Sequence, residues 1–152
     1  MSVSGEVSLE VVRGELVAVA DYAAAAGLEL DADSLTETQL TFYMRFENRS
    51  AERFYAAFEC REYPLHPPVV EFVNEAKTER GTPRLYPQGF HPTPCICMRY
   101  NRRAYSEKGG PHSDWRLLDW RLPTGAGIAI DTLALIVSDL HSKILQSTGR
   151  MG

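Results

Sequence analysis

The chain has 152 residues, of which 44% are hydrophobic and 24% are charged, a balance that excludes a disordered protein and indicates one globular domain over residues 1–152. A net charge of -4 gives the chain no general attraction to nucleic acid or to anionic lipid. No apolar run reaches the roughly 18 residues of a membrane-spanning helix, so we expect neither nucleic acid nor membrane as a partner.

The first predicted element is an amphipathic helix that begins at Ser8 and ends at Gly27. Its apolar residues recur close to a helical period. Ser8 is the candidate N-cap and Gly27 a natural C-terminal stop, while Gly14 weakens the middle of the helix. The apolar residues that carry this period are Leu9, Val12, Leu16, Val19, Ala20 and Ala23.

The pattern then changes to a period of two, which indicates strands. Residues 40–47 and 54–60 each alternate apolar and other side chains, and the short break at 48–50 predicts that they form an antiparallel hairpin. The apolar run at 69–73 predicts a further strand. A sheet of about four antiparallel strands is the expected outcome.

A proline-rich turn precedes that last strand. In the sequence YPLHPP, residues 63–68, the three prolines remove backbone donors and fix φ, so we expect a stiff extended turn. His66 within it is interpreted as a surface or capping residue.

Residues 74–119 show no period and carry many glycines and prolines. An irregular stretch of this length inside a domain is either functional or disordered. The two clustered cysteines, Cys95 and Cys97, lie in it. Partial packing is expected for Tyr100, Tyr105 and Trp115.

Helical spacing returns from Ile128 to Ile144, and Leu122–Pro–Thr–Gly marks the entry to a long helix that closes near Gln146. His141 on this helix is interpreted as a surface or capping residue without a visible partner.

These elements predict an α+β fold: an N-terminal helix, an antiparallel meander and one long C-terminal helix packed across the sheet. The residues predicted to be buried are Leu16, Val19, Phe42, Met44, Phe46, Phe54, Phe58, Phe72, Trp120, Leu133, Ile136, Val137 and Leu140.

The chain has three cysteines, an odd number, and its N-terminus has neither the basic flank nor the apolar core of a secretory signal. This usage predicts a reducing, cytoplasmic location. Cys60 shares the predicted buried face with Phe58 and is interpreted as a core residue. Cys95 and Cys97 are one residue apart and point to opposite faces of an extended chain, so only one should open to solvent.

A family resemblance appears in these motifs. YPLHPP followed by VVEF resembles the Tyr-Pro-x-x-Pro-Pro-x-Val-x-Phe signature of ubiquitin-conjugating enzymes, and HPTPCICM resembles a shortened form of their His-Pro-Asn and Ile-Cys-Leu active-site segment. Trp120, Pro123 and the helix from Ile128 are similar to the Trp-x-Pro step into that family's central helix. The chain is similar to divergent prokaryotic ubiquitin-conjugating-like proteins of antiviral defence operons.

The resemblance implies a ubiquitin-conjugating-like fold with Cys97 as the thioester-forming cysteine. Cys95 matches no family position, although it remains the alternative nucleophile. His91 and Pro92 match the family loop, but Thr93 stands where the family has Asn. A hydroxyl donates one hydrogen bond to a developing oxyanion, whereas an amide donates two.

The implied function is a transferase that takes a ubiquitin-like modifier protein from an activating (adenylating) enzyme onto Cys97 and passes it to a nucleophile on a target protein. A thioester suits this task because it survives in water yet reacts with amines. No cofactor is expected, because the activating enzyme consumes the ATP. The first helix is implied in docking that enzyme.

An unperturbed thiol near pKa 8.5 is only about 3% thiolate at pH 7, so the site needs to activate or position it. Candidate helpers are Arg99, Arg102 and Arg103.

Two alternatives stay open. A zinc site would use His91, Cys95, Cys97 and His112, although a single residue between paired cysteines is a poor zinc spacing. The other alternative is a noncatalytic ubiquitin-conjugating-like domain that only binds proteins, and the aligned Ile96–Cys97–Met98 argues against it.

Overall fold

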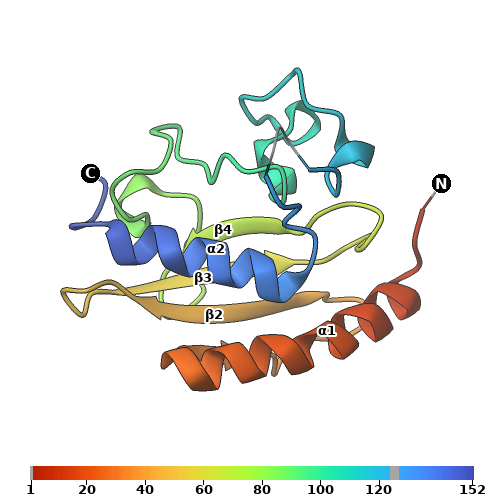
Figure 1. The fold of residues 1–152 in the computed structure, drawn as a ribbon, viewed down its shortest axis with the longest axis horizontal. Helices are drawn as coiled ribbons and strands as arrows, with labels where there is room; N and C mark the ends of the chain where they lie inside the picture. The colour runs from red at the N-terminus through yellow and green to blue at the C-terminus, as the bar shows by residue number, and fades with distance from the viewer. Residues whose placement is uncertain (1, 124–126) are drawn as a thin grey trace.

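The computed structural model describes residues 2–123 and 127–152. Within them the helices and strands follow in the order α1 (Gly5–Ala26), β1 (Glu29–Asp31), β2 (Thr41–Glu47), β3 (Arg53–Glu59), β4 (Val69–Val73) and α2 (Leu133–Gln146). The predicted α+β layout is therefore confirmed. Figure 1 shows both helices on one face of the sheet, with the long segment between β4 and α2 gathered beyond β4. No helix in the described part of the chain is long and apolar enough to cross a membrane.

Helix α1 begins earlier than the sequence predicts. Ser4 is the N-cap, and its side chain accepts a hydrogen bond from the Val7 amide at 3.3 Å. Ser8, the predicted cap, lies inside the helix, where it is buried and donates to the carbonyl of Tyr63 at 2.8 Å. The hydroxyl of Ser8 thus fixes the helix to the proline turn rather than starting the helix. The predicted stop at Gly27 is confirmed, because this glycine adopts the left-handed conformation with φ 73°.

The four strands form an antiparallel meander in the order β1-β2-β3-β4. The register pairs Phe42 with Phe58, whose rings stack 4.8 Å apart, and places Phe46 opposite Phe54. This alternation directs one apolar face of the sheet toward the helices. Strand β1 has three residues and is the one strand that the sequence pattern did not delimit.

The predicted core is confirmed residue by residue, with exposed fractions that run from 0% at Phe42 to 8% at Leu16. It is one cluster that joins both helices to the inner face of the sheet.

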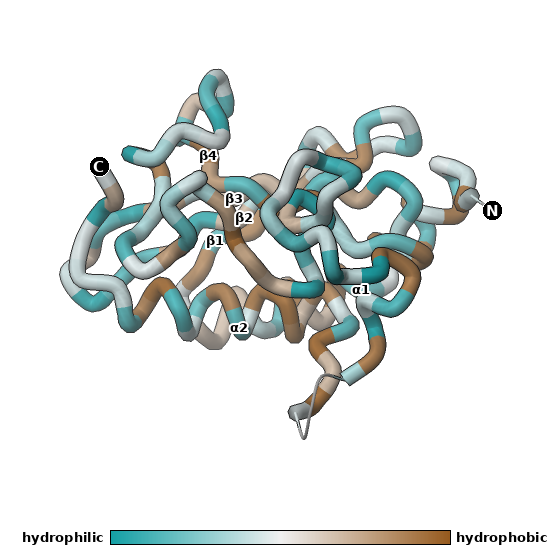
Figure 2. Tube along the Cα trace, turned by 90° about the horizontal axis from the view of Figure 1, so that it is seen from above, coloured by the Kyte–Doolittle hydropathy of each residue, from teal (hydrophilic) through white to brown (hydrophobic). Residues whose placement is uncertain are grey.

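Helix α2 ends at Gln146, as predicted, but it begins later than its apolar spacing indicates. Thr132 is the N-cap and accepts from the amide of Leu135 at 3.3 Å. Ile128 precedes the helix and is 91% exposed, so its apparent place in the helical period is a coincidence of spacing. Thr124 and Gly125, part of the predicted entry, lie outside the described residues. Apolar and hydrophilic stretches alternate along α2 in Figure 2.

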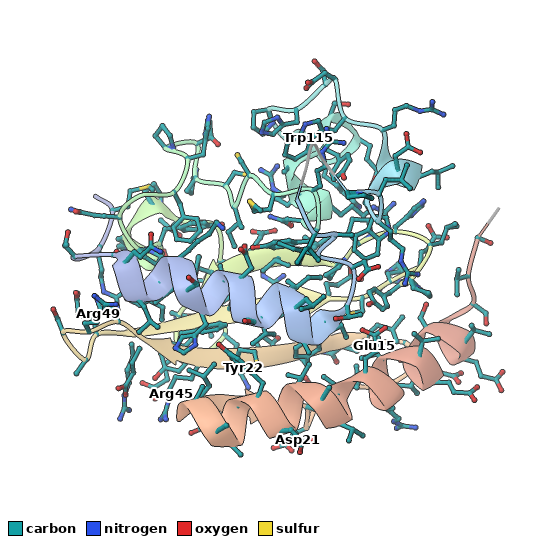
Figure 3. All side chains as sticks on the ribbon, viewed as in Figure 1. Glu15, Asp21, Tyr22, Arg45, Arg49 and Trp115 are labelled. Atoms are coloured by element: carbon teal, nitrogen blue, oxygen red, sulfur yellow. The ribbon has the colours of Figure 1, made fainter. Side chains whose placement is uncertain are left out.

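The proline turn is the point at which the elements meet. The buried Tyr63 donates its hydroxyl to the Glu15 carboxylate of α1 at 2.8 Å, and that carboxylate also accepts from the Leu133 amide at the start of α2 at 2.8 Å. The indole of Trp120 donates to the carbonyl of Leu65 at 3.1 Å. In Figure 3 the Glu15 side chain lies between α1 and α2. The turn therefore holds both helices and the tryptophan in place.

Candidate active site around Cys97

The segment 74–119 contains no α-helix and no strand, as predicted, but it is packed. Short 3-10 turns interrupt it, and Tyr100 and Tyr105 are only 1% and 2% exposed. Trp115 is half-buried against the Tyr105 ring. Figure 3 shows Trp115 in the loop region beyond the β4 edge of the sheet, at the opposite end of the view from α1. This packing gives the two cysteines of the loop defined environments.

A tight turn precedes the cysteines. His91 and Cys95 exchange backbone hydrogen bonds of 3.1 and 3.3 Å, which close the loop over the intervening prolines. The hydroxyl of Thr93 lies 2.9 Å from Nδ1 of His91. Thr93 is exposed, so its hydroxyl contacts the turn from the solvent side.

Cys97 lies at the apex of a second, smaller turn. The amide of Met98 donates to the carbonyl of Ile96 at 2.9 Å, which closes three residues around the cysteine. Ile96 is fully buried and anchors the turn, whereas Cys97 is half-buried. Cys95 is 2% exposed. The predicted difference in exposure between the two cysteines is confirmed, and Cys97 is the more accessible of them.

Asn101 clamps this turn to the sheet. It is fully buried, its Nδ2 donates to the carbonyl of Ile96 at 2.9 Å, and its Oδ1 accepts from the amides of Val70 and Arg103 at 2.8 and 3.1 Å. The bonds to Ile96 and Val70 are buried, so each of them pairs a polar atom that would otherwise lack both water and a partner. Sequence reasoning missed Asn101, since a single Asn in a polar loop carries no pattern.

A second clamp joins the loop to α2. Tyr100 donates its hydroxyl to Oδ2 of Asp139 at 2.8 Å, and Nζ of Lys143 donates to the same oxygen at 2.8 Å. Burial, followed by the charge of Asp139, raises the pKa of Tyr100 well above its ordinary value, so the phenol stays a donor. Sequence reasoning missed this trio as well. The spacing of Asp139 and Lys143 by one helical turn was the available signal.

The environment suppresses ionisation of the two buried cysteines. Burial raises the pKa of Cys95 to about 12, with the neighbouring Cys97 as a second cause, and the charge of Arg103 only partly opposes this. Burial also raises the pKa of Cys60 well above its ordinary value. Both groups therefore remain neutral thiols near pH 7, and Cys60 is the core residue that the sequence predicted.

The three arginines proposed as helpers are engaged elsewhere. Arg102 forms an ion pair with Glu107, and Arg103 donates to a backbone carbonyl at 2.8 Å. The guanidinium of Arg99 lies 5.0 Å from the centre of the Trp115 ring. Of the three, Arg99 is the one that lines a hollow together with Cys97.

Two hollows flank Cys97, and the cysteine lines both. The α2 pocket has a volume of about 340 Å³ and lies between the cysteine loop and the end of α2. The tryptophan pocket has a volume of about 240 Å³ and lies on the other side. The α2 pocket is lined by Gln88, Gly89, Phe90, His91, Cys95, Ile96, Cys97, Met98, Lys143, Gln146 and Ser147. The tryptophan pocket is lined by Cys97, Met98, Arg99, Tyr100, Trp115, Trp120, Leu122, Pro123, Ile128, Ala129 and Ile130. His91 is thus brought to the cysteine's pocket, whereas Thr93 is not part of either lining.

The zinc alternative finds no ligand set in the described residues. Within 2–123 and 127–152, no three side chains of His, Cys, Asp or Glu gather as a metal ion would require. His112 instead stacks its ring on Trp115, with centroids 3.6 Å apart.

His66 and His141, interpreted from the sequence as surface or capping residues, are both half-buried beside polar groups that the sequence does not reveal. Nδ1 of His66 lies 3.1 Å from the Glu62 carboxylate. Nδ1 of His141 lies 2.7 Å from the Tyr22 hydroxyl and so joins α2 to α1.

Comparison of the chain with protein-family models, with curated proteins and with solved structures gives no match. The functional argument therefore rests on the site itself.

Proposed function

We propose that this chain is a ubiquitin-conjugating-like transferase that carries a ubiquitin-like modifier as a thioester on Cys97 and passes it to a nucleophile on a target protein. The observation that carries the proposal is the placement of Cys97. Its thiol lies at a turn apex between two hollows, while the thiols of Cys95 and Cys60 are buried.

The layout of the fold also supports the proposal. The proline turn, Trp120 and the cysteine loop, which carry the resemblance to ubiquitin-conjugating enzymes, lie in one connected region. Trp120 is bonded to the proline turn, and the amide of Arg102 donates to the carbonyl of Pro68 at 2.9 Å. Motifs that are far apart in sequence thereby converge beside Cys97. We accordingly propose a ubiquitin-conjugating-like fold.

The two hollows suit the two groups that must meet at a thioester. A modifier's C-terminal tail needs one approach to the sulfur, and the incoming nucleophile needs another, because attack on the acyl carbon comes from a different side than the leaving sulfur. No metal or cofactor is needed for this exchange, because the acyl group arrives already activated. The activating enzyme, the modifier and the target are the partners that the proposal requires.

The test begins with genes beside this one that encode an adenylating enzyme and a small protein ending in glycine. Mixing those proteins with this chain and ATP should give an adduct that survives on a nonreducing gel and disappears with dithiothreitol. The adduct should be lost in Cys97→Ala and kept in Cys95→Ala. If Cys95→Ala alone abolishes it, the alignment that selects Cys97 is wrong by two residues.

One observation favours the noncatalytic alternative. Leu122 and Ile128, both in the lining of the tryptophan pocket, are 61% and 91% exposed, which is the kind of apolar surface that a protein partner covers. A binding-only domain would leave Cys97 dispensable. Replacement of Leu122 and Ile128 by Ser would then abolish partner capture, whereas Cys97→Ala would have no effect on it.

A further inference from the structure

Among the lysines in the described part of the chain, Lys143 lines a pocket together with Cys97. The chain has three lysines. Lys77 pairs with Asp31 and lies over the ring of Tyr43, on the sheet face opposite the helices. Lys108 lines a separate cleft at the β4 edge. Lys143, near the end of α2, lines the α2 pocket together with Cys97.

The amine of Lys143 is held on the side of α2 that faces the cysteine loop. Its Nζ and the hydroxyl of Tyr100 each lie 2.8 Å from the same Asp139 oxygen, and Tyr100 follows Cys97 by three residues. The Lys143 side chain keeps 37% of its surface exposed, so its four-carbon stem has room to turn within the pocket. The geometry thus supplies a tethered amine with a carboxylate beside it, in the lining of the pocket that Cys97 also lines.

We propose that Lys143 is an intramolecular acceptor of the acyl group carried by Cys97, a self-modification site. This inference rests on the proposed thioester function. The uncharged amine of Lys143 attacks the thioester carbonyl, a C–N bond forms and the C–S bond breaks. The amine's surplus proton passes to Asp139 or water, and the leaving Cys97 sulfur takes up a proton. The product is an isopeptide on Lys143 and a free Cys97 thiol.

The pocket makes this transfer faster than transfer to a lysine elsewhere on the surface. An amine confined beside the thioester reacts at an effective concentration that can exceed the concentration of any free amine in solution by several orders of magnitude. Lys77 and Lys108 have no such confinement with Cys97, so the three lysines provide an internal comparison.

The test uses a short synthetic peptide thioester that ends in Gly-Gly, with a mercaptoethanesulfonate leaving group, and the intact protein. At about pH 8.5, where more of an amine is uncharged than at neutral pH, the peptide should first load Cys97 as an adduct that dithiothreitol removes. A dithiothreitol-resistant adduct should then grow as the first declines, and peptide mapping should place it on Lys143. The rate of this second step should not depend on protein concentration.

Lys143→Arg keeps a cation beside Asp139 and should reduce the resistant adduct by about tenfold or more while the labile Cys97 adduct persists. The matched controls Lys77→Arg and Lys108→Arg should behave as the wild type. A Cys97 adduct with no resistant product on Lys143 would overturn this inference alone, as would equal acylation of Lys143 in Cys97→Ala. Failure of Cys97 to load at all would overturn the proposed function together with it.

Discussion

Cys97 differs from the other two cysteines in its surroundings rather than in its chemistry. Cys60 lies in the core and Cys95 is only 2% exposed, whereas the turn closed by Ile96 and Met98 presents Cys97 between two hollows. Solvent contact keeps a thiol available for ionisation and attack, and burial removes both. Selectivity among the three thiols is therefore expected to be a property of the folded chain.

Brief alkylation of the native protein with iodoacetamide should modify Cys97 about a hundredfold faster than Cys60 or Cys95, because buried groups react only when the structure opens. In Cys97→Ala the remaining thiols should still react slowly, because burial, the largest cause of the raised pKa of Cys95, does not depend on Cys97. Intact-mass analysis and peptide mapping measure the rates. Equal labelling of Cys95 and Cys97 in the folded protein would contradict the assigned burial.

Asn101→Ala should loosen the cysteine turn. The change leaves the Ile96 carbonyl and the amides of Val70 and Arg103 without their buried partner, which should lower the free energy of unfolding by about 3 kcal/mol. Urea denaturation measures this loss. Faster alkylation of Cys95 in the variant should accompany it, because Asn101 holds the carbonyl of Ile96, the next residue in the chain. Unchanged alkylation would show that Asn101 does not hold the loop.

Among the secondary-structure elements, those with a clear period were predictable and those fixed by distant contacts were not. Strands β2 and β3 follow from alternation, β4 follows from its apolar run, and the end of α1 follows from Gly27. The start of α1 was misplaced because Ser8 looks like a cap but is bonded to Tyr63, a contact that no local pattern contains. The start of α2 was misplaced because Ile128 continues the spacing by chance.

The same distinction holds for the site. The proline turn could be predicted from its signature, and alternation predicted that only one of Cys95 and Cys97 would be accessible. The choice of Cys97 came from its match to the Ile-Cys-Leu motif. The role of Asn101 and the bond from Tyr100 to Asp139 could not be predicted, because each joins a loop without a period to a residue that is distant in sequence. The partner of Glu15 is likewise 48 residues away.

Glu15 on α1 accepts hydrogen bonds from the proline turn and from the start of α2, and so connects three parts of the fold. Glu15→Ala leaves the buried Tyr63 hydroxyl and the Leu133 amide without an acceptor, so we expect a loss of about 2 kcal/mol in the free energy of unfolding. The matched control is Glu10→Ala, which removes an exposed carboxylate from the same helix. Equal effects of the two changes in urea denaturation would show that the Glu15 contacts do not stabilise the fold.

For the molecule as a whole, the interface between the two helices should make stability depend on pH. Burial lowers the pKa of His141 below its ordinary 6.5, so between the folded and unfolded pKa values the unfolded chain binds more protons. The stabilisation is complete above about pH 6.5 and is lost as the pH falls through the folded pKa.

His141→Gln should therefore flatten part of the pH dependence. Urea denaturation at about pH 7.5 and about pH 5 should show a larger loss of unfolding free energy in the wild type than in the variant. Carboxylates that titrate in the same pH range contribute equally to both proteins, so their contribution cancels when the two losses are subtracted. If the wild type and the variant lose the same unfolding free energy, His141 has the same pKa in the folded and in the unfolded chain.

The whole account depends on Cys97 being the atom that receives the modifier. Cys97→Ser replaces the sulfur by oxygen, and an acyl group on a hydroxyl is an ester that thiols do not cleave but hydroxide does. The most direct measurement is to incubate this variant with the activating enzyme, the modifier and ATP, treat the product with dithiothreitol, and map the surviving adduct by mass spectrometry. The account predicts a hydroxide-labile ester at position 97. An adduct of undiminished yield that dithiothreitol removes, and that maps to Cys95 or Cys60 in the untreated sample, would contradict it.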